Sequence, residues 1–262
     1  MKDIETSKKI AVLIDAENAQ CSVLAAVLNE ISKHGHIVVK KAYGDWSSTH
    51  LKNWKQPLNE LAINPVQQFS YTQGKNSSDA AMIIDAMDLL YSKQFDAFAL
   101  VTSDSDFTKL ASRLKEAQIF VFGVGEEKTP AAFRNACDDF IRTEVLQLPD
   151  EGRAGSKAGI KTAAAKKNET QLCQDTRMVN ILRNAVAEYA ADDGWAMLGS
   201  CGSLIKRQYP DFDPRSYGCR TFTLLFQATG LFEIERRGSG ATQAVYVKDR
   251  KKQQKAGNRI AG

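Results

Sequence analysis

The sequence predicts an α/β domain, in which helices cover both faces of a parallel sheet, followed by a small winged-helix domain. Residues 1–148 alternate short apolar runs with segments of helical periodicity, as is typical of a parallel sheet buried on both faces. Residues 149–175 are rich in Gly, Ala and Lys and separate the two halves of the chain. The halves also differ in charge, because residues 1–148 carry 16 basic and 19 acidic side chains (−3), whereas residues 149–262 carry 19 and 12 (+7).

Five strands and four helices are expected in the first half. The strands are the apolar runs 10–14, 37–42, 66–71, 98–102 and 120–124, and the helices are 22–34, 51–62, 79–91 and 106–117. Right-handed crossovers between parallel strands bring the carboxyl ends of the strands to one edge of the sheet. We therefore expect functional side chains directly after the strands.

The second half has the element order of a winged helix. Helices are expected over 178–191, 202–208 and 216–228, followed by two strands over 231–236 and 244–248. The predicted division is a domain over 1–148, a flexible linker over 149–175, a second domain over 176–249 and a disordered tail over 250–262. The positive charge of the second half favours contact with a polyanion.

The composition excludes several classes of protein. The 262 residues are 43% hydrophobic and 25% charged, which is ordinary for a folded domain. The sequence has neither an apolar run of the ~20 residues that a membrane span needs nor a secretory signal, so we expect a cytoplasmic protein without membrane contact. Five cysteines without a C-x-x-C pair argue against disulfides and zinc. The three histidines, His34, His36 and His50, have no nucleophile motif beside them and are expected at the surface.

Acidic residues follow two of the predicted strands. Asp15 ends the first strand, Asp104 and Asp106 follow the fourth, and Asp79 opens a helix. Carboxylates gathered at one edge form an oxygen-only site of the kind that Mg²⁺ or Mn²⁺ prefers, where the ion activates water toward a phosphodiester. Helix capping is the alternative for each acid singly, but it explains the whole set less well. We expect the remaining polar residues to bind substrate or to support the site: Asn18, Lys75, Ser103 and Asp85.

Three motifs, Ile14-Asp15-x-x-Asn18, Lys75-x-x-x-Asp79-x₅-Asp85 and Thr102-Ser103-Asp104-Ser105-Asp106-Phe107, occur in this order within residues 9–147. Together they resemble the NYN domain of the PIN-like nuclease superfamily. The resemblance implies a parallel sheet and Mg²⁺- or Mn²⁺-dependent cleavage of RNA, with Asp15, Asp79, Asp104 and Asp106 at the acidic positions. One departure is that Thr102-Ser103 replaces Ser-Gly, which stiffens the backbone there.

The run 202–218 and the following Phe222-x-x-Leu225-Phe226 resemble the OST-HTH or LOTUS domain over about residues 176–248. That resemblance implies an RNA-binding or protein-interaction module. Base stacking is the expected role of Tyr217, with packing inside the turn as the alternative. The candidate RNA contacts are Lys206, Arg207, Arg215, Tyr217, Arg236 and Arg237.

The combined expectation is a metal-dependent ribonuclease whose C-terminal domain recruits RNA. Two alternatives stay open at the level of sequence. One is a non-catalytic RNA-binding or adaptor protein with a degenerate acidic site, in which the C-terminal domain binds protein partners. The other is a DNA-directed nuclease, because carboxylate–metal chemistry does not require a 2′-hydroxyl.

Overall fold

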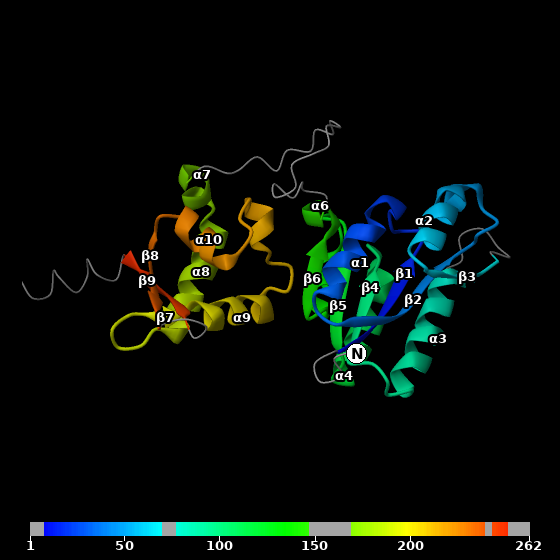
Figure 1. Ribbon diagram of the computed structural model, residues 1–262, viewed down its shortest axis with the longest axis horizontal. Coiled ribbons are helices and arrows are strands. Elements are labelled where there is room, and N and C mark those ends of the chain that lie inside the picture. The colour runs from blue at the N-terminus through cyan, green and yellow to red at the C-terminus, as the bar shows by residue number, and fades with distance from the viewer. Residues whose placement is uncertain (1–7, 70–76, 147–168, 239–242, 251–262) are drawn as a thin grey trace, which may run out of the picture. The chain divides into compact units, whose positions relative to one another are not determined.

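A computed structural model describes residues 8–69, 77–146, 169–238 and 243–250. The chain forms two compact units, residues 1–149 and 150–262. Figure 1 shows the sheet-based unit in blue to green and the smaller helical unit in yellow-green to red.

The first unit contains a six-stranded, wholly parallel sheet with the order β3-β2-β1-β4-β5-β6. The parallel α/β prediction is therefore confirmed. β6 was not predicted, because Phe140 and Ile141 are its only apolar residues. The strands are β1 (Lys9–Asp15), β2 (His36–Gly44), β3 (Asn64–Gln67), β4 (Ala97–Val101), β5 (Phe120–Gly125) and β6 (Asp139–Arg142).

Helices cover both faces of this sheet, because alternate residues of β1 enter two separate cores. Ile10, Val12 and Ile14 pack with α1 (Leu24–Ser32) and α2 (Lys55–Glu60). Ala11 and Leu13 pack with α3 (Ser77–Tyr91), α4 (Thr108–Glu116) and α5 (Ala131–Ala136). The remaining short helices are η1 (Cys21–Val23), η2 (Thr49–Trp54), η3 (Ser105–Phe107) and α6 (Thr143–Leu146).

The second unit has the winged-helix order that the sequence predicts, with small differences. A short strand, β7, pairs with β9, so that the sheet has three antiparallel strands in the order β7-β9-β8. The predicted helix 216–228 is instead two pieces, separated at Gly218, whose φ of 76° ends the first piece. The elements are α7 (Glu169–Gln174), α8 (Thr176–Tyr189), β7 (Ala196–Met197), α9 (Leu198–Gln208), η4 (Pro214–Tyr217), α10 (Phe222–Ala228), β8 (Phe232–Arg237) and β9 (Ala244–Asp249).

The end of the predicted linker belongs to the second unit. α7 lies within 149–175, and its Leu172 is only 1% exposed, in the core of that unit. The Cys173 thiol donates a hydrogen bond to the Thr229 carbonyl over 2.9 Å. The linker prediction is therefore wrong for residues 169–175, while 149–168 and the tail from 251 lie outside the described residues. Within the described ranges, none of the helices has the length and apolar character needed to cross a membrane.

Candidate metal centre

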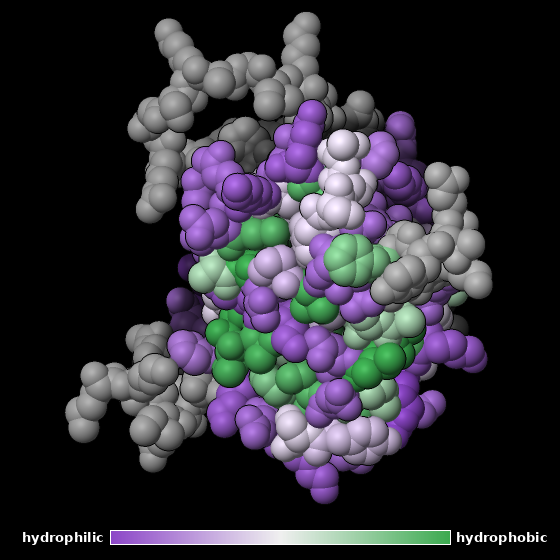
Figure 2. Space-filling view, turned by 90° about the vertical axis from the view of Figure 1, so that its right-hand side faces the viewer, coloured by the Kyte–Doolittle hydropathy of each residue, from purple (hydrophilic) through white to green (hydrophobic). Residues whose placement is uncertain are grey.

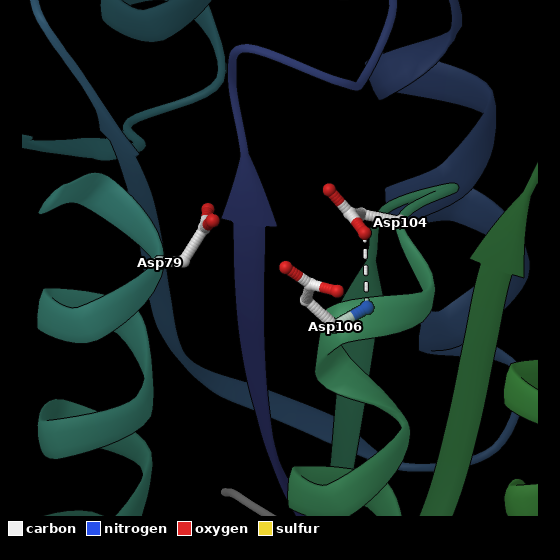
Figure 3. A group of neighbouring side chains, drawn as sticks. All are labelled: Asp79, Asp104 and Asp106. Atoms are coloured by element: carbon white, nitrogen blue, oxygen red, sulfur yellow. Dashed lines mark hydrogen bonds between the residues drawn. The ribbon is translucent and has the colours of Figure 1, made fainter. Parts of the chain in front are cut away.

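Three aspartates converge at the carboxyl edge of the parallel sheet. Asp79 lies in the first turn of α3, Asp104 lies in the loop after β4, and Asp106 lies in η3. One carboxylate oxygen from each residue lies within 4.8 Å of the other two. Figure 3 shows Asp79 reaching from one helix toward the pair on the opposite side. The fold thus brings together three of the four acids that the sequence singled out.

Asp104 caps the helix η3 and also belongs to the acidic cluster. Helix capping and membership of the cluster, which were alternatives at the level of sequence, therefore both apply to this residue. Its Oδ1 accepts a hydrogen bond from the Asp106 backbone N over 2.9 Å, drawn as a dashed line in Figure 3. The backbone of Asp104 is extended (φ −87°, ψ 133°), as is usual for a residue before the first helical turn. The capping bond fixes the spacing between the two carboxylates of this loop.

The cluster is electrostatically strained. Burial of Asp79, which is 8% exposed, together with the negative charges of Asp15, Asp104, Glu17 and Asp106, raises the pKa of Asp79 to about 6. A carboxylate in this position gains free energy by binding either a proton or a cation. Glu17, which the sequence did not suggest for this site, contributes to this field from the loop after β1.

Asp15 lies at the carboxyl end of β1, as the sequence predicts, and its charge acts on Asp79. It is 1% exposed, and it does not belong to the group of three. Its Oδ1 accepts hydrogen bonds from the backbone N atoms of Glu17 and Asn18 (3.1 and 3.2 Å). Its Oδ2 accepts from Asn18 Nδ2 (2.9 Å) and Thr102 Oγ1 (2.8 Å). These four hydrogen bonds hold the loop after β1 and connect it to Thr102 at the end of β4.

Thr102 is the residue that sequence reasoning missed. Its buried hydroxyl donates to Asp15 and accepts from the backbone N of Asp104 over 3.0 Å, so it ties the ends of β1 and β4 together. The neighbouring Ser103 was predicted to bind substrate, but its Oγ accepts a hydrogen bond from the Glu126 backbone N over 2.9 Å. Both side chains therefore hold the loop that carries Asp104. A Thr at the end of an apolar strand gives no signal of this bridging role in the sequence.

Other predicted residues lie outside the cluster. Asn18 uses its amide group to hold Asp15, and Lys75 lies outside the described residues. Asp85 binds Lys41 and Tyr43 of β2. The three histidines are exposed, as predicted.

The predicted RNA contacts of the second unit fall into two groups. Arg207, at the end of α9, is exposed, and Lys206 beside it is half-buried. Arg215 instead binds the Asp213 carboxylate through Nε and Nη2, the latter over 2.8 Å, within its own turn. Tyr217 packs against Phe212 with ring centroids 5.4 Å apart, so the packing alternative describes its ring.

Arg236 and Arg237, the last two residues of β8, differ in their contacts. Arg236 is exposed near the end of β8, and no carboxylate of the described residues forms an ion pair with it. Arg237 points to the other side of the strand, where its guanidinium lies 5.0 Å from the Trp195 ring centroid and 4.7 Å from that of Tyr246. Glu235 binds Arg237 as well, over 3.0 Å. Arg237 is therefore held by its neighbours within the second unit, although 38% of its side chain is exposed.

The parallel sheet and its acidic edge agree with the family comparison, which supports a PIN-like nuclease domain. The family model of the NYN domain matches residues 9–145, and that of the OST-HTH/LOTUS domain matches residues 173–243. The chain belongs to the NYN family and carries an OST-HTH/LOTUS domain after its NYN domain.

Similar proteins add no named activity. An uncharacterized protein of Methanocaldococcus jannaschii is 30% identical over 149 residues, which are 55% of this chain and 59% of that protein. A crystal structure of a protein of unknown function from Vibrio parahaemolyticus covers 54% of this chain and 96% of its own, with 18% identity and a TM-score of 0.45. A solution structure of an uncharacterized protein from Nitrosomonas europaea covers 40% of this chain and 90% of its own, with 25% identity and a TM-score of 0.25.

Proposed function

We propose that the protein is a metal-dependent ribonuclease that hydrolyses RNA phosphodiester bonds at Asp79, Asp104 and Asp106, and that its OST-HTH/LOTUS domain recruits the RNA. The convergence of these three carboxylates within 4.8 Å, in a member of the NYN family, carries the proposal. In this account Asp15 and Thr102 position Asp104 and do not touch the substrate.

The donor set suits a hard divalent cation. All three candidate ligands are carboxylate oxygens, and the raised pKa of Asp79 reflects its burial and the repulsion of neighbouring carboxylates, which a cation would offset. Mg²⁺ or Mn²⁺ would supply Lewis acidity at the phosphodiester when bound there. The chain itself contributes the spacing of the ligands, because the cap at Asp104 and the bridge through Thr102 are hydrogen bonds within the chain.

Recruitment of RNA rests on the basic charge of the second half and on basic side chains at its surface, of which Arg207 and Arg236 are exposed and Lys206 is half-buried. Lys206, Arg207 and Arg236 remain the proposed phosphate contacts, with attraction that weakens as salt rises because counterions are released on binding. Arg237, which is held by aromatic rings and Glu235, is proposed to order the wing instead. Lys75, four residues before Asp79, stays a proposed contact to the phosphate at the acidic edge.

The test is a cleavage assay with labelled single- and double-stranded RNA and DNA, in Mg²⁺, Mn²⁺ or EDTA. The full-length protein is compared with Asp79→Asn, Asp104→Asn and Asp106→Asn, and with Asp88→Asn as an exposed control on α3. We expect RNA cleavage that requires the metal, is at least ~100-fold slower in the three site variants, and is unchanged in the control.

Two results would decide against this proposal. Equal cleavage of DNA would favour the DNA-directed nuclease. RNA binding without cleavage under any metal condition would favour the non-catalytic adaptor, in which the acidic cluster has no catalytic role.

A further inference from the structure

A second polar cluster lies on the same helix as Asp79, between α3 and β2. Asp85 Oδ2 accepts hydrogen bonds from both Lys41 Nζ (2.7 Å) and the Tyr43 hydroxyl (2.8 Å). Tyr43 is 1% exposed, and the side chains of Lys41 and Asp85 are 25% and 28% exposed. The cluster is therefore a largely desolvated tether between the helix and the sheet.

The register of the sheet connects this tether to the metal centre. Tyr43 is paired with Asp15 across β1 and β2, and the Tyr43 carbonyl accepts a hydrogen bond from the backbone N of Ala16 over 2.9 Å. Paired residues of neighbouring parallel strands point to the same face, so Tyr43 and Asp15 lie side by side under α3. Tyr43 thus touches α3 at one end and the strand that carries the Asp15 loop at the other.

α3 has few other directional contacts that would fix its rotation. Its inner face contributes Met82, Ala86 and Leu90 to the core, and such apolar contacts are non-directional. On its outer face Ile84 and Tyr91 are 63% and 66% exposed. Figure 2 shows apolar side chains in green, scattered among hydrophilic ones, on the side of the molecule that Figure 1 labels α3 and β3. Among the described residues, the helix is packed mainly from the sheet side.

Rotation of α3 about its axis would displace the carboxylate of Asp79. Asp79 and Asp85 are six residues apart, which is a rise of ~9 Å and a turn of ~240° around the helix. With side-chain atoms ~5 Å from the helix axis, a rotation of ~10° moves the Asp79 carboxylate by about 1 Å. Functional constellations tolerate displacements of only ~0.5 Å.

We propose that Lys41, Tyr43 and Asp85 form a positioning cluster that sets the rotation of α3 and so holds Asp79 at the distance from Asp104 and Asp106 that divalent-cation binding requires. This inference rests on the proposed function insofar as the three aspartates bind the cation. The Tyr43 hydroxyl is suited to a permanent tether, because burial and the neighbouring Asp85 raise its pKa above its ordinary value and keep the proton in place.

The test is the affinity of the full-length protein for Mn²⁺ alone, measured by electron paramagnetic resonance of the free ion. Asp85→Ala removes both hydrogen bonds, and Tyr43→Phe removes one while keeping the buried ring. Asp85→Asn removes the same charge as Asp85→Ala but retains an acceptor oxygen, so it separates hydrogen bonding from long-range charge. Asp88→Ala is the matched control, because Asp88 is an exposed acid on the same helix.

We expect the dissociation constant to rise ~10-fold in Asp85→Ala, in the range seen when outer partners of metal ligands are removed. Tyr43→Phe should shift in the same direction by a smaller factor, whereas Asp85→Asn and Asp88→Ala should stay within about threefold of the wild type. Melting temperatures are measured on the same samples, so that affinities are compared well below unfolding.

Unchanged Mn²⁺ affinity in both Asp85→Ala and Tyr43→Phe, with or without a fall in melting temperature, would overturn the positioning role. Equal losses in Asp85→Ala and Asp85→Asn would assign the effect to charge and overturn it as well. Failure of the metal site itself gives a different result, in which wild type and Asp79→Asn bind Mn²⁺ equally; this result would remove the basis of both proposals.

Discussion

Replacing Asp79 by Asn is predicted to stabilise the metal-free protein at alkaline pH. The pKa of Asp79 in the folded state is about 6, above its ordinary value of 3.8. Between these values the folded protein holds a proton that the unfolded chain has lost, so the free energy of unfolding falls as the pH rises through this window. Above pH ~7 the destabilisation is complete, and below pH ~4 it is absent.

The magnitude follows from the size of the shift. About two pKa units at ~1.4 kcal/mol each give a ceiling of ~3 kcal/mol. Water reaches the cluster, since Asp106 is exposed, and this screening reduces the expected gain to about 1–2 kcal/mol. For a domain of about 150 residues this corresponds to a rise in melting temperature of ~3–6 °C.

The assay is thermal unfolding of the full-length protein in EDTA at pH 4 and pH 8, with Asp88→Asn as the control on the same helix. We expect Asp79→Asn to melt at a higher temperature than wild type at pH 8, with little difference at pH 4. The control should show no such dependence. A variant that is no more stable than wild type at pH 8, or that is equally stabilised at both pH values, would refute the raised pKa of Asp79 as the cause of the destabilisation.

Three further predictions concern the loops and the second domain. Thr102→Val should lower stability by about 1–3 kcal/mol, because it leaves the Asp104 N–H without its acceptor, and it should slow cleavage ~10-fold; Thr102→Ser should restore both. In RNA titrations at two salt concentrations, Arg236→Ala should weaken binding and reduce the salt slope by about one, whereas Arg237→Ala should mainly lower the melting temperature of the second domain. Limited trypsin digestion should cut first within residues 149–168, while α7 stays protected by buried Leu172.

The fold was largely accessible from the sequence because the signals are local. Continuous apolar strands such as 10–14 and 98–102 identify a sheet covered on both faces wherever they occur. β6 is the exception, since its four residues begin with Asp139 and end with Arg142 and so resemble a loop. α7 was missed for a similar reason, because one buried leucine in a polar stretch is a weak signal.

The site was only partly accessible because hydrogen bonding between distant segments leaves no local pattern. The position of Asp15 after a strand predicts its place at the edge of the sheet, but not that Thr102 would occupy one of its oxygens. Helical geometry predicts that Asp85 does not share a face with Asp79. It does not predict which residues of β2 form hydrogen bonds with Asp85. Arg237 shows the same limit, because Trp195 lies more than forty residues upstream.

The central claim is that Asp79, Asp104 and Asp106 bind a divalent cation. The most direct test is anomalous diffraction from crystals of the full-length protein grown or soaked with Mn²⁺. We predict a peak between these three carboxylates, at oxygen distances of about 2.0–2.2 Å, with Asp15 still hydrogen-bonded to Thr102. The absence of a peak there in crystals whose cluster is accessible to solvent, or a peak held by Asp15 without Asp79, would contradict the account.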